Sequence, residues 1–229
     1  MNIAVLNVGV IRPSFKRVVD NIKQNIQLLN EKYPQYNFQH FNYFYPDPNL
    51  EEDFVALCEE NNIKCYKLPT ADERSYTKGY TLFDNTYKCW KNLENSFIHL
   101  NEFIKEEFDA IIRTRLDFEI KNIIIPNEIK DNIIYARQLD DFSIFDNFSI
   151  LTPLTYNKIY DINIVDACFR TLTPDNFHFY NNEQLLNLIC LNTNIKCEDM
   201  SFEIQGYQTN DKYWNGSPQW SKSNRNFKF

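Results

Sequence analysis

The sequence predicts a single α/β domain in which a central, mostly parallel sheet carries helices on both of its faces. The first observation is the alternation of short apolar segments with longer segments of helical periodicity, which is typical of such folds. The second is size, because 229 residues with 43% hydrophobic content can bury one full core. Since no repeat or linker divides the chain, we expect one domain over residues 1–204, followed by a polar and aromatic C-terminal segment over 205–229.

The first half of the chain opens with an apolar strand over residues 3–10, which Gly9 and the pair Arg12-Pro13 bring to an end. Apolar residues then recur at helical spacing over 15–29. Further expected elements are a strand over 36–45, a helix from 49 or 50 to 61, a strand over 63–68 and a helix over 81–106. The long last helix carries an aromatic stripe, which we interpret as core rather than as a platform for stacking bases.

The second half continues with a short apolar strand over 110–112, which runs into a cluster of charges. Short strands are then expected over 123–125, 132–136 and 148–151. One helix is expected to start at residues 152–153 and another to cover 181–191. Two edge strands are expected over 195–197 and 202–204. Pro153 suits the first position of its helix, because the missing N–H has no intrahelical partner there.

The charge cluster holds two arginines, Arg113 and Arg115, followed by two acids, Asp117 and Glu119. Side chains two apart on an extended chain share a face, so we expect each pair to lie together. Two carboxylates at the end of a strand can hold Mg²⁺ or Mn²⁺ together with a diphosphate, and the guanidiniums would add positive charge. The alternative is that both acids begin a polar turn and pair with the arginines.

Ligands of parallel sheets bind beyond the carboxyl ends of the strands. Three segments of this chain are expected at that edge: residues 9–12, the polar loop 69–79 with Arg74 and Lys78, and residues 117–119. Their convergence supports a binding site.

Composition excludes several classes of protein. A net charge of −7 and a pI of about 5.1 argue against nucleic acid as a partner. With four glycines the sequence contains neither G-x-G-x-x-G nor a P-loop, so a bound phosphate would depend on metal and basic side chains. We expect no transmembrane segment and no signal peptide, and we expect six reduced, mostly buried cysteines in a cytoplasmic protein, because no C-x-x-C pair occurs.

The order of short motifs resembles a known family. An opening strand ends in Gly-x-x-Arg-Pro, and a helix with Tyr-Lys-Cys-Trp-Lys-Asn-Leu-Glu leads into Phe-Asp-Ala-Ile-Ile-Arg-Thr-Arg-Leu-Asp-Phe-Glu. Asp-Asn-Phe-Ser-Ile from Asp146 and Asn-Glu-Gln-Leu-Leu from Asn182 follow. Over most of residues 1–200 this order is similar to small nucleotide-sugar glycosyltransferases of the GT-A type from bacteria and large DNA viruses, in particular those with an Arg-x-Arg-x-Asp segment.

The resemblance implies a GT-A-like (Rossmann-like) domain that binds a nucleoside-diphosphate sugar with Mn²⁺ or Mg²⁺. The D-x-D-like metal motif falls on Asp117 and Glu119, with Glu in place of the usual second Asp. The residues then expected to bind the nucleotide sugar are Gly9, Arg12, Arg74, Lys78 and Arg113.

The implied reaction transfers a sugar to a hydroxyl group of a glycan or glycoconjugate. Inversion at the anomeric carbon requires a base, for which Glu183 is the first candidate and Asp146 the second, whereas retention requires none. Arg113 or Arg115 would add positive charge that stabilises the departing diphosphate, with Arg115 as the catalytic candidate, unless strand alternation directs both at buried carboxylates. Glu183 could instead be an ordinary acid in the first turn of a helix, and His178 could be a metal ligand or a structural residue.

Two other functions stay open. One is a non-catalytic carbohydrate-binding or assembly protein with a degenerate site. The other is a sugar nucleotidyltransferase, which normally has a glycine-rich loop after the first strand, whereas residues 9–16 contain one glycine. The C-terminal segment is either a frayed end or a flap that covers a bound anion with Tyr213, Trp214 or Trp220.

Overall fold

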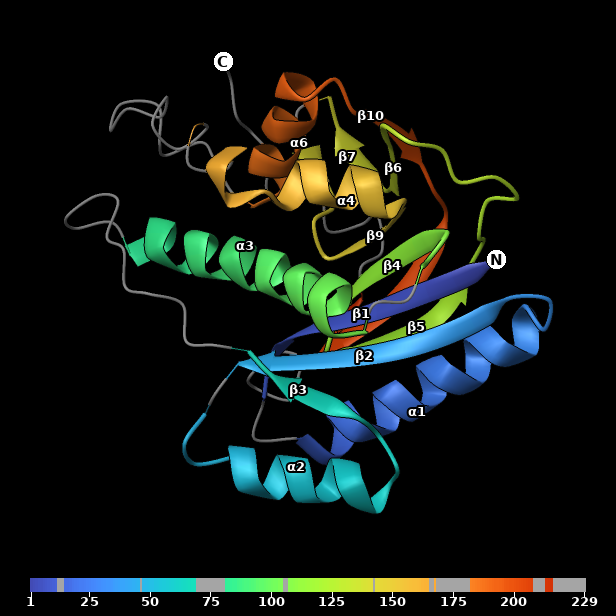
Figure 1. The fold of residues 1–229 in the computed structure, drawn as a ribbon, viewed down its shortest axis with the longest axis vertical. Coiled ribbons are helices and arrows are strands. Elements are labelled where there is room, and N and C mark those ends of the chain that lie inside the picture. The colour runs from blue at the N-terminus through green and yellow to red at the C-terminus, as the bar shows by residue number, and fades with distance from the viewer. Residues whose placement is uncertain are drawn as a thin grey trace.

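The protein is an α/β domain built on a seven-stranded sheet, as Figure 1 shows for the computed structural model. The structure describes residues 1–11, 15–45, 47–68, 81–104, 107–141, 143–164, 167, 182–207 and 213–215. The strand order is β10-β6-β9-β4-β1-β2-β3, in which β9 alone runs antiparallel to its neighbours β4 and β6. The expected α/β class with a mostly parallel sheet is therefore confirmed.

The strands are β1 (Asn2–Val10), β2 (Asn37–Tyr45), β3 (Cys65–Lys67), β4 (Ala110–Arg115), β5 (Phe118–Ile123), β6 (Ile133–Ala136), β7 (Gln138–Asp140), β8 (Ser143–Ile144), β9 (Phe148–Leu151), β10 (Lys196–Asp199), β11 (Phe202–Tyr207) and β12 (Tyr213–Asn215). The helices are α1 (Phe15–Lys32), α2 (Glu51–Glu60), α3 (Thr81–His99), which continues into the π-helical turn η1 (Leu100–Ile104), α4 (Pro153–Tyr160) and α6 (Asn182–Asn192). In the part of the chain that is described, no helix is long and apolar enough to cross a membrane.

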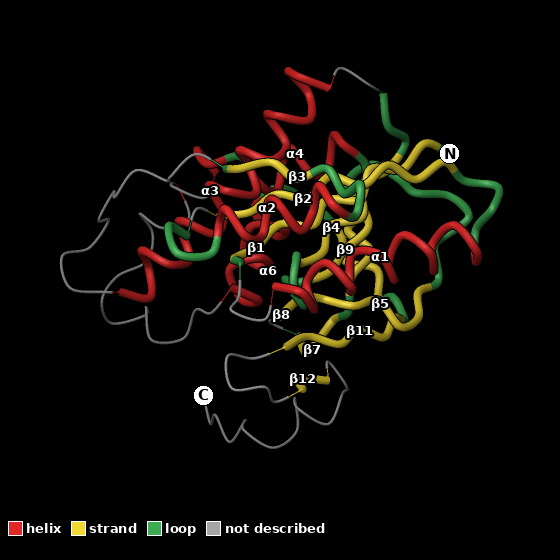
Figure 2. Tube along the Cα trace, turned by 90° about the horizontal axis from the view of Figure 1, so that it is seen from below, coloured by secondary structure: helices red, strands yellow, loops and turns green. Residues whose placement is uncertain are grey.

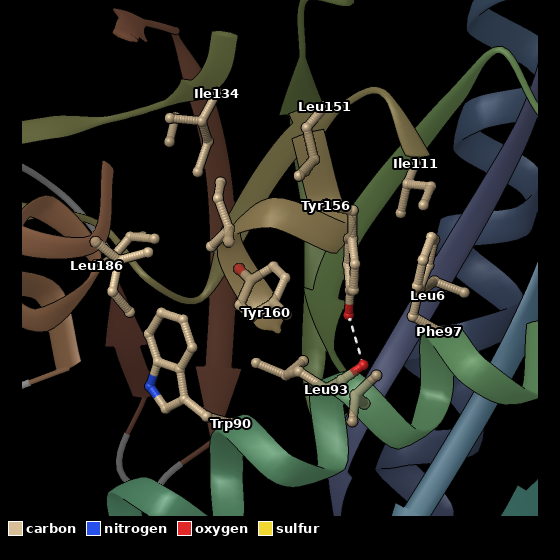
Figure 3. Packing of buried hydrophobic residues seen from close by; sticks show 14 of the residues in the cluster. Leu6, Trp90, Leu93, Phe97, Ile111, Ile134, Leu151, Tyr156, Tyr160 and Leu186 are labelled. Carbon is tan, nitrogen blue, oxygen red and sulfur yellow. Dashed lines mark hydrogen bonds between the residues drawn. The ribbon is translucent and has the colours of Figure 1, made fainter. Parts of the chain in front are cut away.

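Helices cover both faces of the main sheet. In Figure 1, α3, α4 and α6 lie on one side and α1 and α2 on the other. The side with α3, α4 and α6 holds the larger aromatic core, part of which is drawn in Figure 3. There Trp90 packs on Tyr160 with ring centroids 5.0 Å apart, and the Tyr156 hydroxyl donates to the Leu93 carbonyl over 3.1 Å. The aromatic stripe of the long helix is thus core, as predicted.

A second, three-stranded sheet of β5, β11 and β12 lies beside α1, as Figure 2 shows. Two asparagines on the buried side of α1 fix this arrangement. Asn25 donates to the Phe118 carbonyl over 2.9 Å and accepts from the Ile120 amide over 2.7 Å, while Asn21 donates to the Asp117 carbonyl over 3.2 Å. These bonds satisfy backbone groups of β5 and of the turn before it, which would otherwise be buried without partners.

Several element boundaries differ from those expected. β4 extends through both arginines to Arg115 instead of ending at residue 112, and only two residues separate it from β5. Residues 124 and 125 lie outside any strand. β11 continues past residue 204 and pairs with β12, so 205–207 and 213–215 form sheet rather than a frayed end. The expected domain boundary falls inside β11.

Candidate functional site

The strand directions bring one group of polar residues to one edge of the main sheet. β1, β2 and β4 are parallel, with Val8 opposite Arg115 and Val10 opposite Tyr45, so their carboxyl ends meet there. β9 runs the other way and places Phe148 opposite Thr114. Asp146, two residues before β9, therefore lies at the same edge. This is the edge at which the sequence predicts a site.

Arg115 and Asp117 form a bidentate ion pair at the end of β4. The Arg115 Nε lies 2.9 Å from one oxygen of Asp117 and its Nη2 lies 2.7 Å from the other. The Asp117 side chain is only 2% exposed and that of Arg115 29%. The guanidinium also lies over the Phe118 ring, 4.6 Å from its centroid. Asp117 stands in the turn between β4 and β5, where strand alternation no longer sets the direction of its side chain.

Glu119 has a different partner, Lys121 on the same strand β5. Neither acid of the predicted metal motif therefore presents a free carboxylate. Among the residues that the structure describes, no three His, Cys, Asp or Glu side chains are placed to hold a metal ion together. A metal bound by Asp117 would have to replace Arg115, so this arrangement does not fit a preformed two-carboxylate metal site.

Arg113 is the deepest charge at this edge, with 3% exposure. Its Nε and Nη1 have no acceptor among the described residues, although each is fully buried. Burial favours a lower pKa for Arg113, but Tyr160, Asp146 and Cys89 outweigh it and the pKa rises. A buried charged donor without a partner is costly, by about 1–3 kcal/mol or more. The Arg113 guanidinium is thus positively charged in a buried position, and two of its N–H donors have no acceptor among the described residues.

Asp146 is a buried carboxylate whose charge helps to raise the pKa of Arg113. Burial raises its pKa, and the charges of Arg113 and Arg115 oppose that rise. The side chain accepts hydrogen bonds from Asn147, over 2.8 Å, and from Asn182 at the start of α6. Asp146 therefore connects the arginines of β4 to the N-terminus of α6.

Glu183 follows Asn182 in the first turn of α6 and is half-buried. Burial, together with the negative charge of Asp146, raises the pKa of Glu183 to about 7. A carboxyl group with this pKa exchanges its proton near neutral pH, which suits general acid–base work. The predicted candidates Arg113, Arg115, Asp117, Asp146 and Glu183 are thus brought together.

The structure adds site residues that the sequence analysis missed. The Tyr45 hydroxyl, at the end of β2, hydrogen-bonds with Asn92 and Cys89 of α3. Ser149 lies opposite Arg113 in the β4–β9 pair. The hydroxyl of Ser149 and the side-chain oxygens of Asn92 and Asn182 are buried and have no partner in the described chain. Tyr45 could have been found as the last residue of a strand that ends at this edge, whereas Asn92 and Ser149 carry no sequence signal.

Gly9 has a structural reason to be glycine. A Cβ added there would lie 3.2 Å from the Leu116 Cβ and 3.3 Å from the Leu116 amide nitrogen, so the residue lets β1 approach the turn after β4. The predicted nucleotide-binding residues Arg12, Arg74 and Lys78 lie outside the described residues, as do His178 and Trp220. Tyr213 and Trp214 belong to β12.

No protein-family model and no curated protein matches the sequence. Among solved structures, the chain is similar to a glycosyltransferase involved in the glycosylation of the major capsid of PBCV-1. The sequence identity is 11%, the match covers 87% of this chain and 81% of that chain, and the TM-score is 0.44.

Proposed function

We propose that the chain is a glycosyltransferase that moves a sugar from a nucleoside-diphosphate sugar to a hydroxyl group of a glycan or glycoconjugate. The polar cluster at the carboxyl edge of β1, β2 and β4 is its active site. Both the order of motifs in the sequence and the geometry of this cluster support this function.

One observation carries the proposal: unused hydrogen-bonding atoms gather at this edge. Arg113 offers two buried donors, Asn92 and Asn182 each offer a buried acceptor oxygen, and the Ser149 hydroxyl can do either. Buried polar groups are ordinarily paired, so such a group of exceptions points to a missing ligand. A ligand that satisfies them needs both donors and acceptors within a small volume, and the hydroxyl groups of a sugar provide both.

The charges of the cluster are balanced. Two guanidiniums, Arg113 and Arg115, lie beside two buried carboxyl groups, Asp117 and Asp146. Glu183, with a pKa of about 7, adds a third carboxyl group that is only partly charged at neutral pH. This balance suits the uncharged sugar better than a diphosphate. The nucleotide part would need more positive charge, for which the sequence offers Arg12, Arg74 and Lys78 in its polar loops.

Glu183 is the residue we propose as catalytic base. It is more exposed than Asp146, and its proton exchanges near neutral pH. In an inverting reaction it would take the proton of the attacking hydroxyl. Asp146 is a weaker candidate, because it is buried between the arginines and Asn182. Its charge keeps the proton affinity of Glu183 high.

Metal dependence is a separate proposal. Mn²⁺ or Mg²⁺ would supply Lewis-acid stabilisation of the leaving diphosphate, with Asp117 and Glu119 as the candidate ligands. Arg115 and Lys121 already pair with these two carboxylates, so a metal ion would have to displace both side chains. Arg115 is itself a candidate, without a metal ion, to stabilise the negative charge of the leaving diphosphate.

The test combines ligand binding with turnover. Thermal unfolding is followed with UDP, GDP, CDP and dTDP and with the corresponding sugars, each with and without Mn²⁺, since a ligand of the folded state raises the midpoint. Release of nucleoside diphosphate from nucleotide sugars measures turnover. We expect one nucleotide to raise the midpoint, and Glu183→Gln to abolish turnover without abolishing binding. Glu60→Gln, an exposed acid on α2, is the matched control.

The outcomes separate the alternatives. A midpoint that rises with free sugars but with none of the nucleotides would instead identify a carbohydrate-binding protein. A nucleotide effect that needs Mn²⁺ and is lost in Asp117→Ala would support the metal proposal. No effect of any nucleotide or sugar on the folded protein would contradict the proposed function.

A further inference from the structure

The turn between β4 and β5 holds the Arg115 guanidinium in one orientation. Its Nε and Nη2 donate to the two oxygens of Asp117 over 2.9 and 2.7 Å, so the carboxylate contacts one edge of the guanidinium. The ring of Phe118 lies against the face of the same group, with its centroid 4.6 Å from the Arg115 Cζ. A planar fork that is held at an edge and at a face keeps little freedom to rotate. Arg115 is therefore oriented before any ligand binds.

The backbone of this turn is anchored from α1. The Asn21 side chain donates to the Asp117 carbonyl over 3.2 Å, and the Asn25 side chain donates to the Phe118 carbonyl over 2.9 Å. Both asparagines are buried, with 2% and 1% exposure. A shift of the turn would leave these buried polar groups unpaired, which is costly. The fold thus sets the backbone position of Asp117, and through it the position of Arg115.

The two members of the ion pair differ in their access to solvent. The side chain of Asp117 is 2% exposed and that of Arg115 is 29% exposed. A guanidinium carries five N–H donors, and since Asp117 accepts from two of them, the other three point away from this carboxylate. Such a planar fork matches two oxygens of a phosphate group. A ligand at this edge of the sheet therefore reaches the guanidinium of Arg115 and not the carboxylate of Asp117.

We infer that Asp117 is a positioning residue that acts through Arg115 and not through a metal ion. This role rests on the proposed function. In that reaction the acceptor oxygen bonds to the anomeric carbon and gives its proton to Glu183, while the bond to the diphosphate breaks and its electron pair stays on the diphosphate. The remaining donors of Arg115 stabilise this charge, because donors that are already held in place need no reorganisation. Asp117 cannot pair with Arg115 and bind a metal through the same oxygens, so the two roles exclude each other.

A double-mutant cycle measures whether Asp117 acts through Arg115. Asp117→Asn, Arg115→Gln and the double variant are assayed for release of nucleoside diphosphate in the presence of EDTA. We expect kcat to fall about 10- to 100-fold in Asp117→Asn and about 100-fold in Arg115→Gln, with little change in KM, because the contact strengthens in the transition state. The double variant should be no slower than Arg115→Gln, since Asp117 then has no guanidinium to orient. Glu128→Gln, which breaks the exposed ion pair with Lys130, is the control and should keep the wild-type kcat.

Nucleotide binding gives a second measurement, which does not depend on turnover. The nucleotide among UDP, GDP, CDP and dTDP that raises the midpoint of thermal unfolding should raise it in EDTA as well, and should do so by less in both single variants. Arg115→Gln leaves the buried Asp117 carboxylate without its partner. If this variant does not fold, Arg115→Lys, which keeps the charge but not the fork, replaces it in the cycle.

The outcomes distinguish this role from the proposed function on which it rests. Turnover of the wild type in EDTA, with losses that do not multiply in the double variant, supports Asp117 as a positioning residue. Turnover that vanishes in EDTA and returns with Mn²⁺, or losses that multiply in the double variant, overturns this role and leaves the glycosyltransferase proposal intact. A folded wild type that neither binds nor turns over any nucleotide sugar, with or without Mn²⁺, contradicts both.

Discussion

His40 makes the stability of the fold depend on pH. It lies on β2 opposite Val5 of β1, and both of its ring nitrogens are buried without a partner in the described chain. Burial lowers its pKa from 6.5 to about 4. The folded state therefore holds a neutral imidazole over a pH range in which the unfolded chain is already protonated.

The size of the effect follows from linkage. The unfolded chain takes up a proton as the pH falls through 6.5, and the folded state does so only near 4. Stability that is present above pH 6.5 is thus lost as the pH falls towards 4. The loss from this group is about 2 kcal/mol by about pH 5 and about 3 kcal/mol by about pH 4. A buried phenylalanine has no such proton, and replacing an unpaired polar ring by an apolar one costs little.

The assay is urea unfolding of wild type and His40→Phe at neutral pH and at about pH 5, with the difference between the two proteins as the readout. We expect the variant to gain about 2 kcal/mol relative to wild type on acidification. The same substitution at His99, which is bonded to Tyr43 and less buried, should give a smaller pH-dependent gain. If the difference between His40→Phe and wild type does not change with pH, His40 is not held neutral by burial and the reasoning is refuted.

Three further predictions concern the site and its support. Gly9→Ala places a Cβ 3.2 Å from that of Leu116 and should lower the free energy of unfolding by about 1 kcal/mol, measured by urea unfolding; an unchanged value would contradict the close approach. Asp146→Asn removes the charge that helps to raise the pKa of Glu183, so any activity that needs the Glu183 carboxylate should extend to lower pH than in wild type, where its acid limb lies near 7. If the acid limb of the pH–rate profile does not move in this variant, the charge of Asp146 does not influence the pKa of Glu183. Thr152→Ala removes the N-cap of α4 and should cost about 1 kcal/mol by thermal unfolding, whereas Thr152→Ser should restore most of it.

Local pattern was enough to predict most elements. The strand before the long helix, the helix begun by Pro153 and the helix over α6 follow from apolar periodicity and from capping residues, and all three are confirmed in type. Boundaries failed where a tertiary contact decides them. Arg113 and Arg115 were expected beyond the end of a strand, yet β4 includes both, because their backbones pair with Ser149 and Val8 in neighbouring strands.

The support of the site was the harder part to foresee. Asn21 and Asn25 interrupt the apolar stripe of α1. From the sequence alone, both would be assigned to the solvent-exposed polar face of the helix. Their hydrogen bonds to the turn and strand after Arg115 become visible only when β5 lies beside the helix. The pairing of Asp117 was one of two alternatives, and spacing alone could not choose between metal and arginine. A bidentate geometry needs the three-dimensional path of the turn.

The direction of a single strand explains why Asp146 and Glu183 belong to the site. If β9 were parallel to β4, the residues before it would lie at the amino edge of the sheet, away from Arg113. Because β9 is antiparallel, its start meets the end of β4, and Asp146 comes within reach of both arginines. Asn182 then ties the first turn of α6 to Asp146, which brings Glu183 to the same place. The alternation that predicts a parallel sheet says nothing about this reversal, so the proximity of these two carboxyl groups depends on a feature that only the topology supplies.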